Sequence, residues 1–286
     1  MGASDNISSR TGVVGVLGHP VGHSLSPRVH NAALTAQGVD MVYLAFDVAP
    51  EWLPEAVAGL RALGFRGANV TIPHKEAIAR LLDEIEVSAQ RIGSVNTVVN
   101  DQGRLLGYNT DKSGFAAALR TIRAEGAAGL SCFVAGAGGA ARAVVAALTE
   151  EGAREILVCN RTFERAASLC SQAASWGSAA CVPTAEKDAA VSAAACDLLV
   201  NATSVGLGPS IKESAIPVDI VHSHQIVMDL VYGPSPTTLV REARARGATA
   251  IDGKEMLVMQ AAGSYELWTG RRAPLDVMRQ SLDEER

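Results

Sequence analysis

The sequence has few aromatic residues, few cysteines and no long hydrophobic run. Phe, Trp and Tyr make up 4% of its 286 residues, although hydrophobic residues as a whole make up 48%. A chain that is rich in alanine, glycine and valine but poor in aromatics is typical of helices packed closely on parallel strands, and not of an all-β module. At this length it can bury a sizeable core within one large or two medium domains.

The cysteines are too few and too scattered for a disulfide framework or a zinc site. There are five, an odd number without a C-x-x-C pair, and they are Cys132, Cys159, Cys170, Cys181 and Cys196. We expect them to be buried as small hydrophobic side chains in a reducing compartment. The six histidines show no metal-ligand spacing, so the sequence predicts no metal site.

The charge balance and the lack of apolar runs argue against nucleic acid and membranes as partners. The net charge is −5, without the basic excess of a nucleic-acid-binding domain. The start, MGASDNISSRTG, is too polar for a signal peptide, and no apolar run approaches the ~18 residues of a membrane span. We therefore expect a cytoplasmic protein, monomeric or homodimeric, whose partners are small molecules.

Hydrophobic periodicity predicts two successive α/β series. The expected elements in chain order are strand 12–18, a helix with Ser26 as N-cap and Pro27 at its first position, strand 41–48, helix 51–64, strand 67–72, a hairpin turning at 100–103, helix 111–126, strand 131–135, helix 139–150, strand 155–159, helix 162–175, strand 197–201 and helix 252–270. The β-α-β-α-β order of the first series predicts a parallel layer. A domain change is expected near 108–111.

A lysine follows the third predicted strand. In ANVTIPHKEA (68–77), apolar and polar residues alternate up to Ile72, and Pro73 suits the first turn of a helix. Lys75 would then lie in that first turn, where the helix dipole disfavours a positive charge. Such a lysine is either an ordinary surface charge or a group that is held in place to transfer a proton.

A glycine-rich turn joins strand 131–135 to the helix that follows. It reads Gly136, Ala137, Gly138, Gly139, Ala140, Ala141, a G-x-G-x-x-A pattern. In dinucleotide-binding domains the first glycine allows a tight turn, the second lets the backbone approach a pyrophosphate, and the helix N-terminus donates N–H groups to the anion. We predict a dinucleotide site here; the alternative is a turn that serves packing alone.

The end of the next strand indicates which dinucleotide binds. An NAD site would place Asp or Glu roughly twenty residues after the glycines. The chain instead has Asn160, Arg161 and Thr162, with Arg165 one turn later. Guanidinium groups suit a 2′-phosphate, so NADP is favoured, unless both arginines are ordinary helix-surface charges. The loop DLLVNATSVGLGP (197–209), with Thr203, would lie at the same sheet edge.

Nine short segments combine into one pattern along the chain. They are GHPVGHSLSPRVHN (18–31), NVTIPHK (69–75), GSVNT (93–97), GYNTD (107–111), GAGGAARA (136–143), NRTFERA (160–166), NATSVG (201–206), DLVYGP (229–234) and DGKEMLVMQA (252–261). Through them the chain resembles the shikimate dehydrogenase family over nearly its whole length. The resemblance implies reversible NADPH-dependent reduction of 3-dehydroshikimate to shikimate, a step of aromatic amino acid biosynthesis.

The resemblance also implies roles for individual residues. Lys75 and Asp111 would form the catalytic pair. The substrate would be held by Ser24 and Ser26 at its carboxylate and by Thr71, Asn96, Tyr232 and Gln260 elsewhere. Besides the glycine turn and Asn160, Arg161, Thr162 and Arg165, the cofactor would contact Thr203, Leu230, Gly253 and Met256.

The implied fold is two α/β domains with a cleft between them. Residues 1–110, completed by C-terminal helices at 253–286, would bind substrate and carry the catalytic pair. Residues 111–252 would form a Rossmann-type NADP domain. Two other functions stay open: a sister enzyme for quinate or an amino-substituted analogue, and a non-catalytic NADP-sensing module. A sensor would not need the pair of Lys75 and Asp111.

Overall fold

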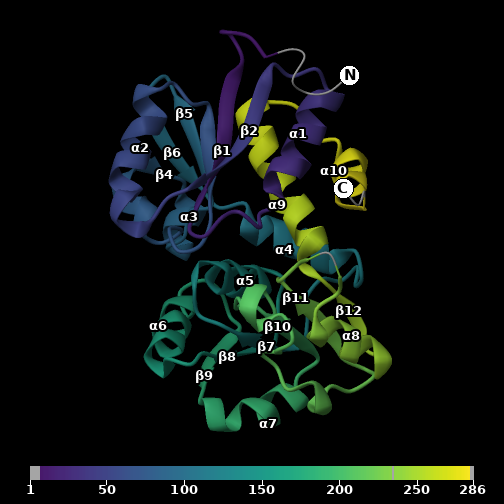
Figure 1. Cartoon of the computed structure of the whole chain (residues 1–286). Helices are drawn as coiled ribbons and strands as arrows, with labels where there is room; N and C mark the ends of the chain where they lie inside the picture. Colours follow the sequence, from purple (N-terminus) through teal and green to yellow (C-terminus); the bar gives the residue numbers. More distant parts are fainter. Residues whose placement is uncertain (1–6, 234, 284–286) are drawn as a thin grey trace. The chain divides into compact units, whose positions relative to one another are not determined.

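The chain folds into two compact units, each built on its own six-stranded sheet (Figure 1). The computed structural model describes residues 7–233 and 235–283. One unit comprises the chain up to Gly114 and again from Leu257, and the other comprises Phe115–Met256. The predicted domain boundaries, after 110 and after 252, each lie four residues before the boundaries of the two units. The outer ends of the predicted domains, at 1–6 and 284–286, lie outside the described residues.

The sheet of the first unit is mixed and differs in strand direction between its two parts: the strands of the predicted β-α-β-α-β series are parallel, as expected, and the strands of the hairpin that follows are antiparallel. Its order is β2-β1-β3-β5-β6-β4, with β1 parallel to β2 and β3, and β5 antiparallel to β3 and β6. The strands are β1 Gly12–Gly18, β2 Met41–Asp47, β3 Gly67–Val70, β4 Glu84–Ile85, β5 Thr97–Asp101 and β6 Arg104–Tyr108. The predicted hairpin is confirmed and causes the difference: Gln102 and Gly103 have φ of 50° and 94°, the two-residue turn that reverses a strand.

Several helix boundaries of the first unit differ from the predicted ones. They are α1 Ser26–Ala36, α2 Leu53–Ala62, α3 Val87–Ile92, α4 Asp111–Arg120, α9 Gly253–Thr269 and α10 Leu275–Asp283, with single 3₁₀ turns at Pro50–Trp52 and Ala77–Leu81. The chain passes between the units within α4 and again within α9. The predicted helix 252–270 is confirmed as α9, and Asp252, just before its first residue, accepts from the Lys254 amide through Oδ1 at 3.0 Å.

Local hydrogen bonding explains two of the shifted helix boundaries. Ser26 is the first residue of α1 and Leu25 its N-cap, so the prediction of Ser26 as the cap is wrong. The Ser24 hydroxyl accepts the Ser26 amide instead, at 3.3 Å. Helix α4 ends at Arg120 because the Thr121 amide and hydroxyl both bond to the Ala118 carbonyl, at 3.2 and 2.7 Å, which closes the last turn.

The prediction that Lys75 lies in the first turn of a helix is wrong. The Ile72–Pro73 peptide is cis, and the His74 amide donates to the Thr71 carbonyl at 2.9 Å. The next helical turn, of 3₁₀ type, begins only at Ala77. Proline is as well suited to a turn as to a helix start, and the sequence pattern did not distinguish the two. A helix dipole therefore does not act on Lys75.

Alternation along the strands gives the first sheet one apolar and one polar central face. Val70 and Val98 pack in the same core as Leu53 of α2. Their neighbours Asn69 and Thr97 point to the other side, where each bonds to Ser264 of α9. Because successive side chains of a strand alternate between faces, these polar residues are placed by the same pattern that builds the core.

The sheet of the second unit is parallel throughout and has Rossmann topology, as predicted. Its order β12-β11-β10-β7-β8-β9 places β7 and β10 at the centre, where the strand order reverses. The strands are β7 Ser131–Ala135, β8 Glu155–Cys159, β9 Ala180–Thr184, β10 Leu198–Asn201, β11 Ile226–Asp229 and β12 Thr249–Ile251, and the helices are α5 Gly139–Glu150, α6 Phe163–Ala173, α7 Ala189–Ala194 and α8 Thr238–Ala245. The sequence analysis did not identify β9, β11, β12, α7 or α8.

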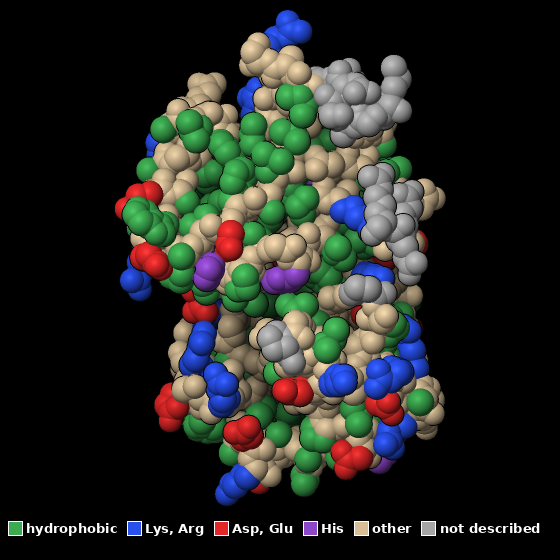
Figure 2. All heavy atoms as spheres, in the orientation of Figure 1, with side chains coloured by type: hydrophobic (Ala, Val, Ile, Leu, Met, Phe, Trp, Pro, Cys, Tyr) green, Lys and Arg blue, Asp and Glu red, His purple; other side chains and the backbone are tan. Residues whose placement is uncertain are grey.

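The cysteines and the surface agree with a chain that packs without disulfides. All five cysteines are free thiols, four of them buried, as predicted. On the face drawn in Figure 2, basic and acidic side chains lie interspersed over the second unit, while hydrophobic side chains gather over β1 and β2 of the first. Among residues 7–233 and 235–283, no helix is long and apolar enough to cross a membrane, and no cluster of potential ligands could hold a metal ion.

One buried histidine makes the stability of the first unit depend on pH. His30 of α1 is 1% exposed, and its ring stacks on Tyr43 with centroids 4.3 Å apart. Burial lowers the pKa of His30 to about 3, although the Asn69 side chain opposes the shift. The folded protein thus keeps this imidazole neutral where an unfolded chain would protonate it.

We expect the free energy of unfolding to fall as pH drops from about 6.5 toward 3, by at most about 5 kcal/mol from this group, because only the unfolded state binds the proton there. Urea unfolding at several pH values measures the slope. The variant His30→Gln cannot titrate at this position, so its stability should depend less on pH. An unchanged slope in the variant would contradict the assignment.

Candidate active site

Lys75 and Asp111 form a short ion pair in the first unit. Lys75 lies in the turn after β3, and Asp111 is the first residue of α4. The ammonium Nζ donates to Asp111 Oδ2 at 2.6 Å, and the two side chains are only 14% and 6% exposed. A charge-assisted hydrogen bond that is shielded from water is stronger than a surface ion pair. The structure therefore brings the two predicted catalytic residues together.

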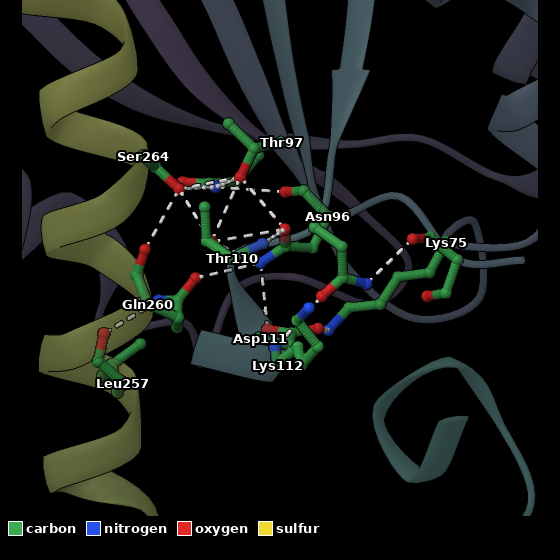
Figure 3. A network of polar contacts seen from close by, with 12 residues as sticks. Lys75, Asn96, Thr97, Thr110, Asp111, Lys112, Leu257, Gln260 and Ser264 are labelled. Atoms are coloured by element: carbon green, nitrogen blue, oxygen red, sulfur yellow. Dashed lines mark hydrogen bonds and ion pairs between the residues drawn. The ribbon is translucent and has the colours of Figure 1, made fainter. Parts of the chain in front are cut away.

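Asn96 holds the other oxygen of Asp111. Its Nδ2 donates to Asp111 Oδ1 and to Thr110 Oγ1, each at 2.9 Å, and lies 3.3 Å from Gln260 Oε1 (Figure 3). Its Oδ1 accepts the Thr110 backbone amide at 2.7 Å. A backbone N–H can only donate, so this bond fixes which end of the Asn96 amide faces Asp111. Both amide hydrogens of Asn96 are thus used within the protein.

Gln260 reaches this group from α9, because α4 and α9 approach closely. A Cβ added to Gly114 would lie 2.8 Å from Cβ of Gln260, so a larger residue there would push the helices apart. Gln260 Nε2 donates to the Leu257 carbonyl at 2.8 Å, which points Oε1 toward Asn96. The sequence thus predicted four side chains of one connected cluster.

Three further residues of the cluster were missed: Thr97, Thr110 and Ser264. Thr97 and Thr110 lie within quoted segments but were given no role, and Ser264 lies beyond the last segment. Ser264 follows Gln260 by four residues, so both project from the same face of α9. That spacing was the available signal.

Ser24, Ser26 and Thr71 lie at the ends of the central strands of the same sheet. Ser24 follows β1, and its hydroxyl accepts the Ser26 amide. Thr71 follows β3, its amide donates to the Leu17 carbonyl at 2.9 Å, and its side chain packs against Gly18. Thr71 and Lys75 share the connection between β3 and the next 3₁₀ turn. Parallel strands thus end beside hydroxyl groups, as in many α/β binding sites.

The glycine turn of the second unit has the form that a bound pyrophosphate needs. Gly136 has φ of +113°, and an added Cβ would lie 2.9 Å from the Ala202 carbonyl, so only glycine fits. Gly138 is the N-cap of α5, and the space around its Cα is open. Gly139 and Ala140 begin the helix, whose first N–H groups have no intrahelical acceptor and suit an anion. Ala137 is buried within the turn.

The arginine-bearing segment lies beside that turn. The Gly136 amide donates to the carbonyl of Cys159, the last residue of β8, at 2.7 Å. Asn160 follows, and its Nδ2 donates to the Thr162 carbonyl at 2.9 Å. Thr162 is the N-cap of α6, and the side chains of Arg161, Thr162 and Arg165 are exposed. The structure thus places both guanidinium groups after the strand next to β7.

A buried polar network shapes the loops after β10 and β11. Asn201 accepts from the Thr203 amide and hydroxyl at 3.0 and 2.7 Å, and its Nδ2 donates to Asp229 at 2.8 Å. The Thr237 hydroxyl donates to the other oxygen of Asp229 at 2.6 Å. Burial raises the pKa of Asp229 to about 6, although these hydrogen bonds oppose the shift. The network fixes Thr203 at the carboxyl edge of the sheet; the sequence analysis assigned no role to Asn201 or Asp229.

The remaining predicted cofactor residues gather after β11. The Gly253 amide donates to the Val231 carbonyl at 3.1 Å, and Gly253 packs on the backbone of Leu230 and near the ring of Tyr232. Met256 is buried one turn into α9. Tyr232 also lines a hollow of about 640 Å³ between the loops after β10 and β11.

Three segments of the chain match profiles of one family. Residues 16–98 match the shikimate dehydrogenase substrate binding domain, residues 119–226 match shikimate / quinate 5-dehydrogenase, and residues 253–282 match the shikimate 5'-dehydrogenase C-terminal domain. The matches follow one another along both units.

Individual relatives agree over nearly the full length. Shikimate dehydrogenase (NADP(+)) of Moorella thermoacetica is 49% identical over 282 residues, which cover 97% of this chain and 95% of that protein. A crystal structure of a shikimate dehydrogenase in complex with NADP+ gives a TM-score of 0.89 at 39% identity, with 96% of each chain covered. Shikimate 5-dehydrogenase of Thermus thermophilus, solved with NADP(H) and shikimate, gives 0.82 at 39% identity, with 95% of this chain and 98% of that one covered. The chain belongs to the shikimate dehydrogenase family.

Proposed function

We propose that this protein catalyses the reversible, NADPH-dependent reduction of 3-dehydroshikimate to shikimate. The observation that carries the proposal is the shielded Lys75–Asp111 pair, held by Asn96 in a chain whose relatives are NADP-dependent shikimate dehydrogenases. The protein would thus be an oxidoreductase acting on a CH–OH group.

Lys75 is the proton donor in the proposed reduction. When bound, NADPH supplies a hydride to the ketone carbon, and negative charge develops on the ketone oxygen. The Lys75 ammonium gives a proton to that oxygen, so that the C=O bond becomes CH–OH. In the reverse direction the neutral amine takes the proton back. Asp111 Oδ2, 2.6 Å from Nζ, orients the ammonium group. General acid catalysis of this kind contributes typically ~10²–10⁴-fold in rate.

In our proposal, the second unit binds NADP. The open helix N-terminus at Gly138 would receive the pyrophosphate, and Arg161 and Arg165 the 2′-phosphate. The remaining parts of NADP would be contacted by Thr203, by Met256 and by the backbone at Leu230 and Gly253. These residues follow the carboxyl ends of β7, β8, β10, β11 and β12, the edge at which dinucleotides bind in such sheets.

The first unit would bind the substrate. Ser24 and Ser26 offer hydroxyls for the carboxylate, and Thr71 and Gln260 offer groups for its ring hydroxyls and carbonyl, with Tyr232 and Asn96 as further proposed contacts. Because both amide hydrogens of Asn96 bond within the protein, its contribution would be through Asp111 or by exchanging one of those bonds.

We also propose a cytoplasmic location and a monomeric or homodimeric state. The free cysteines suit a reducing compartment. The net charge of −5 offers no attraction for nucleic acid.

Substrate choice tests the function directly. Quinate has an additional hydroxyl on its carboxylate-bearing carbon, and Thr71, packed against Gly18, has little room to move away from it. We therefore expect kcat/KM for shikimate to exceed that for quinate by at least about tenfold, which corresponds to about 1.4 kcal/mol. Initial rates with shikimate and quinate, each with NADP and NAD, measure the ratio.

The crossed assay also distinguishes the alternatives. Comparable values for the two substrates would place the protein in the quinate/shikimate branch. NADP binding without turnover of either substrate would favour the sensing module.

A further inference from the structure

Ser264 is a fully buried polar residue that the proposed reaction does not use. It lies on α9 and is 0% exposed. Its hydroxyl oxygen is 2.8 Å from Asn69 Nδ2, 2.8 Å from Thr97 Oγ1 and 3.2 Å from Thr110 Oγ1 (Figure 3). Few hydroxyls have so many side-chain partners without reaching solvent, and buried networks of this kind are costly unless every member is satisfied.

Two backbone groups fix the orientation of both amides around Ser264. The Thr110 N–H requires an acceptor and therefore faces Asn96 Oδ1, at 2.7 Å. The Asn96 carbonyl requires a donor and therefore faces Asn69 Nδ2, at 3.1 Å. The Tyr43 hydroxyl is then correctly placed to donate to Asn69 Oδ1, at 2.8 Å. With these amides fixed, Ser264 must accept a hydrogen from Asn69.

The remaining hydroxyl hydrogens then fall into a closed ring. Asn96 Nδ2 donates to Thr110 Oγ1 at 2.9 Å, and Thr97 donates to Asn96 Oδ1 at 3.1 Å. Thr110 Oγ1 and Ser264 Oγ are 3.2 Å apart, and Ser264 Oγ and Thr97 Oγ1 are 2.8 Å apart. Either hydroxyl of each pair can donate, and the ring closes when Thr110 donates to Ser264 and Ser264 donates to Thr97. The other acceptor near Ser264, the Gln260 carbonyl, is farther away at 3.2 Å and already accepts a helical amide. Each ring member both donates and accepts, all in one direction.

Asn96 connects the ring to the carboxylate of Asp111. The second hydrogen of Asn96 Nδ2 goes to Asp111 Oδ1 at 2.9 Å. Oδ1 is thereby held as an acceptor, which leaves Oδ2 to the ammonium of Lys75 at 2.6 Å. If the Asn96 amide turned over, its carbonyl oxygen would face the carboxylate and repel it.

We propose that Ser264 is a positioning residue for the catalytic pair. By closing the hydrogen-bond ring of Asn96, Thr110, Ser264 and Thr97, it holds the Asn96 amide, and through it the Asp111 carboxylate, in the orientation that Lys75 needs. The inference rests on the proposed role of Lys75 and Asp111 and extends it to a residue of the C-terminal helix.

The test is the variant Ser264→Ala in the full-length protein. It removes the Ser264 hydroxyl that lies between Thr97 and Thr110, so Asn96 keeps its bond from the Thr110 amide but loses the support of these two hydroxyls. We expect kcat for shikimate oxidation to fall about tenfold, while KM for NADP stays within about twofold of the wild-type value. The free energy that a tenfold fall represents is of the order of the cost of leaving a buried polar group without a hydrogen-bond partner.

A matched control separates positioning from general loss of packing. Ser281 of α10 is also a buried serine of this unit, and its hydroxyl donates to the Met278 carbonyl at 2.7 Å, away from the ring. Ser281→Ala should lower the melting temperature slightly but leave kcat unchanged. Within the ring, Thr97→Ser keeps the hydroxyl and should retain activity, whereas Thr97→Val should behave like Ser264→Ala and serves in its place if that variant does not fold.

The outcomes are distinguishable from a failure of the proposed function. If Lys75→Met is severely impaired while Ser264→Ala and Thr97→Val keep kcat within about twofold, the positioning role is refuted and the mechanism stands. If Lys75→Met itself retains activity, the mechanism fails first. A double variant Ser264→Ala/Thr97→Val that loses less than the sum of the two single losses supports one shared ring.

Discussion

Replacement of Lys75 by methionine is expected to lower kcat for shikimate oxidation by at least about 10²-fold, the low end for general acid–base catalysis. Methionine is nearly isosteric with lysine but cannot accept or donate the proton. Lys75 lies in a turn, outside any helix or strand, and its ammonium bonds to Asp111, so the fold should survive. KM should change less than kcat, because the lost interaction acts mainly in the transition state. Steady-state rates and NADP binding measure the two effects.

The effects of changing Lys75 and Asp111 on kcat should also be coupled. Asp111→Asn should lower kcat as well, and the double variant should lose less in activation free energy than the two single losses combined, because each change already disables the 2.6 Å contact. A Lys75→Met enzyme with near-normal kcat and intact NADP binding would mean that Lys75 is a surface charge and the mechanism is wrong.

The parts of the fold that the sequence predicted are those encoded by local patterns. Apolar runs predicted β1, β7 and β8. The glycine pattern predicted the turn at Gly136, where the positive φ requires glycine. The long helix α9 was predicted within one residue of each of its ends. In each case the chemistry that determines the structure lies within a few neighbouring residues, so the sequence alone carries the signal.

The missed parts depend on partners far apart in the chain. Asn69 and Ser264 are separated by 195 positions, and Thr97 and Ser264 by 167, so no local spacing indicates that they meet. The turn at Lys75 was misassigned because Pro73 fits a helix start and a turn equally well. Lys75 is held in place by its ion pair with Asp111, and no helix dipole acts on it. Its role therefore depends on a tertiary contact, which the local sequence does not indicate.

Removal of Arg161 is expected to weaken NADP binding about 10- to 150-fold while changing NAD binding little. A charged hydrogen bond to a phosphate contributes about 1.5–3 kcal/mol, and NAD lacks the 2′-phosphate. Arg161 is exposed at the carboxyl end of β8, beside the glycine turn that would hold the pyrophosphate. Arg165→Ala should act in the same direction. Dissociation constants for both cofactors, from titration calorimetry or fluorescence, give the ratio for each variant.

The same strand supplies a control for this prediction. Arg154 immediately precedes β8 at its amino end, is 68% exposed and lies 3.9 Å from Asp197. Arg154→Ala removes an equal charge from the same unit, so any general effect of net charge on an anionic cofactor should appear in it too. If Arg161 binds the 2′-phosphate, only its loss should reduce the preference for NADP over NAD. An equal loss for both cofactors in Arg161→Ala would instead show that this arginine stabilises the start of α6, and the absence of a carboxylate after β8 would then be the remaining basis for NADP selectivity.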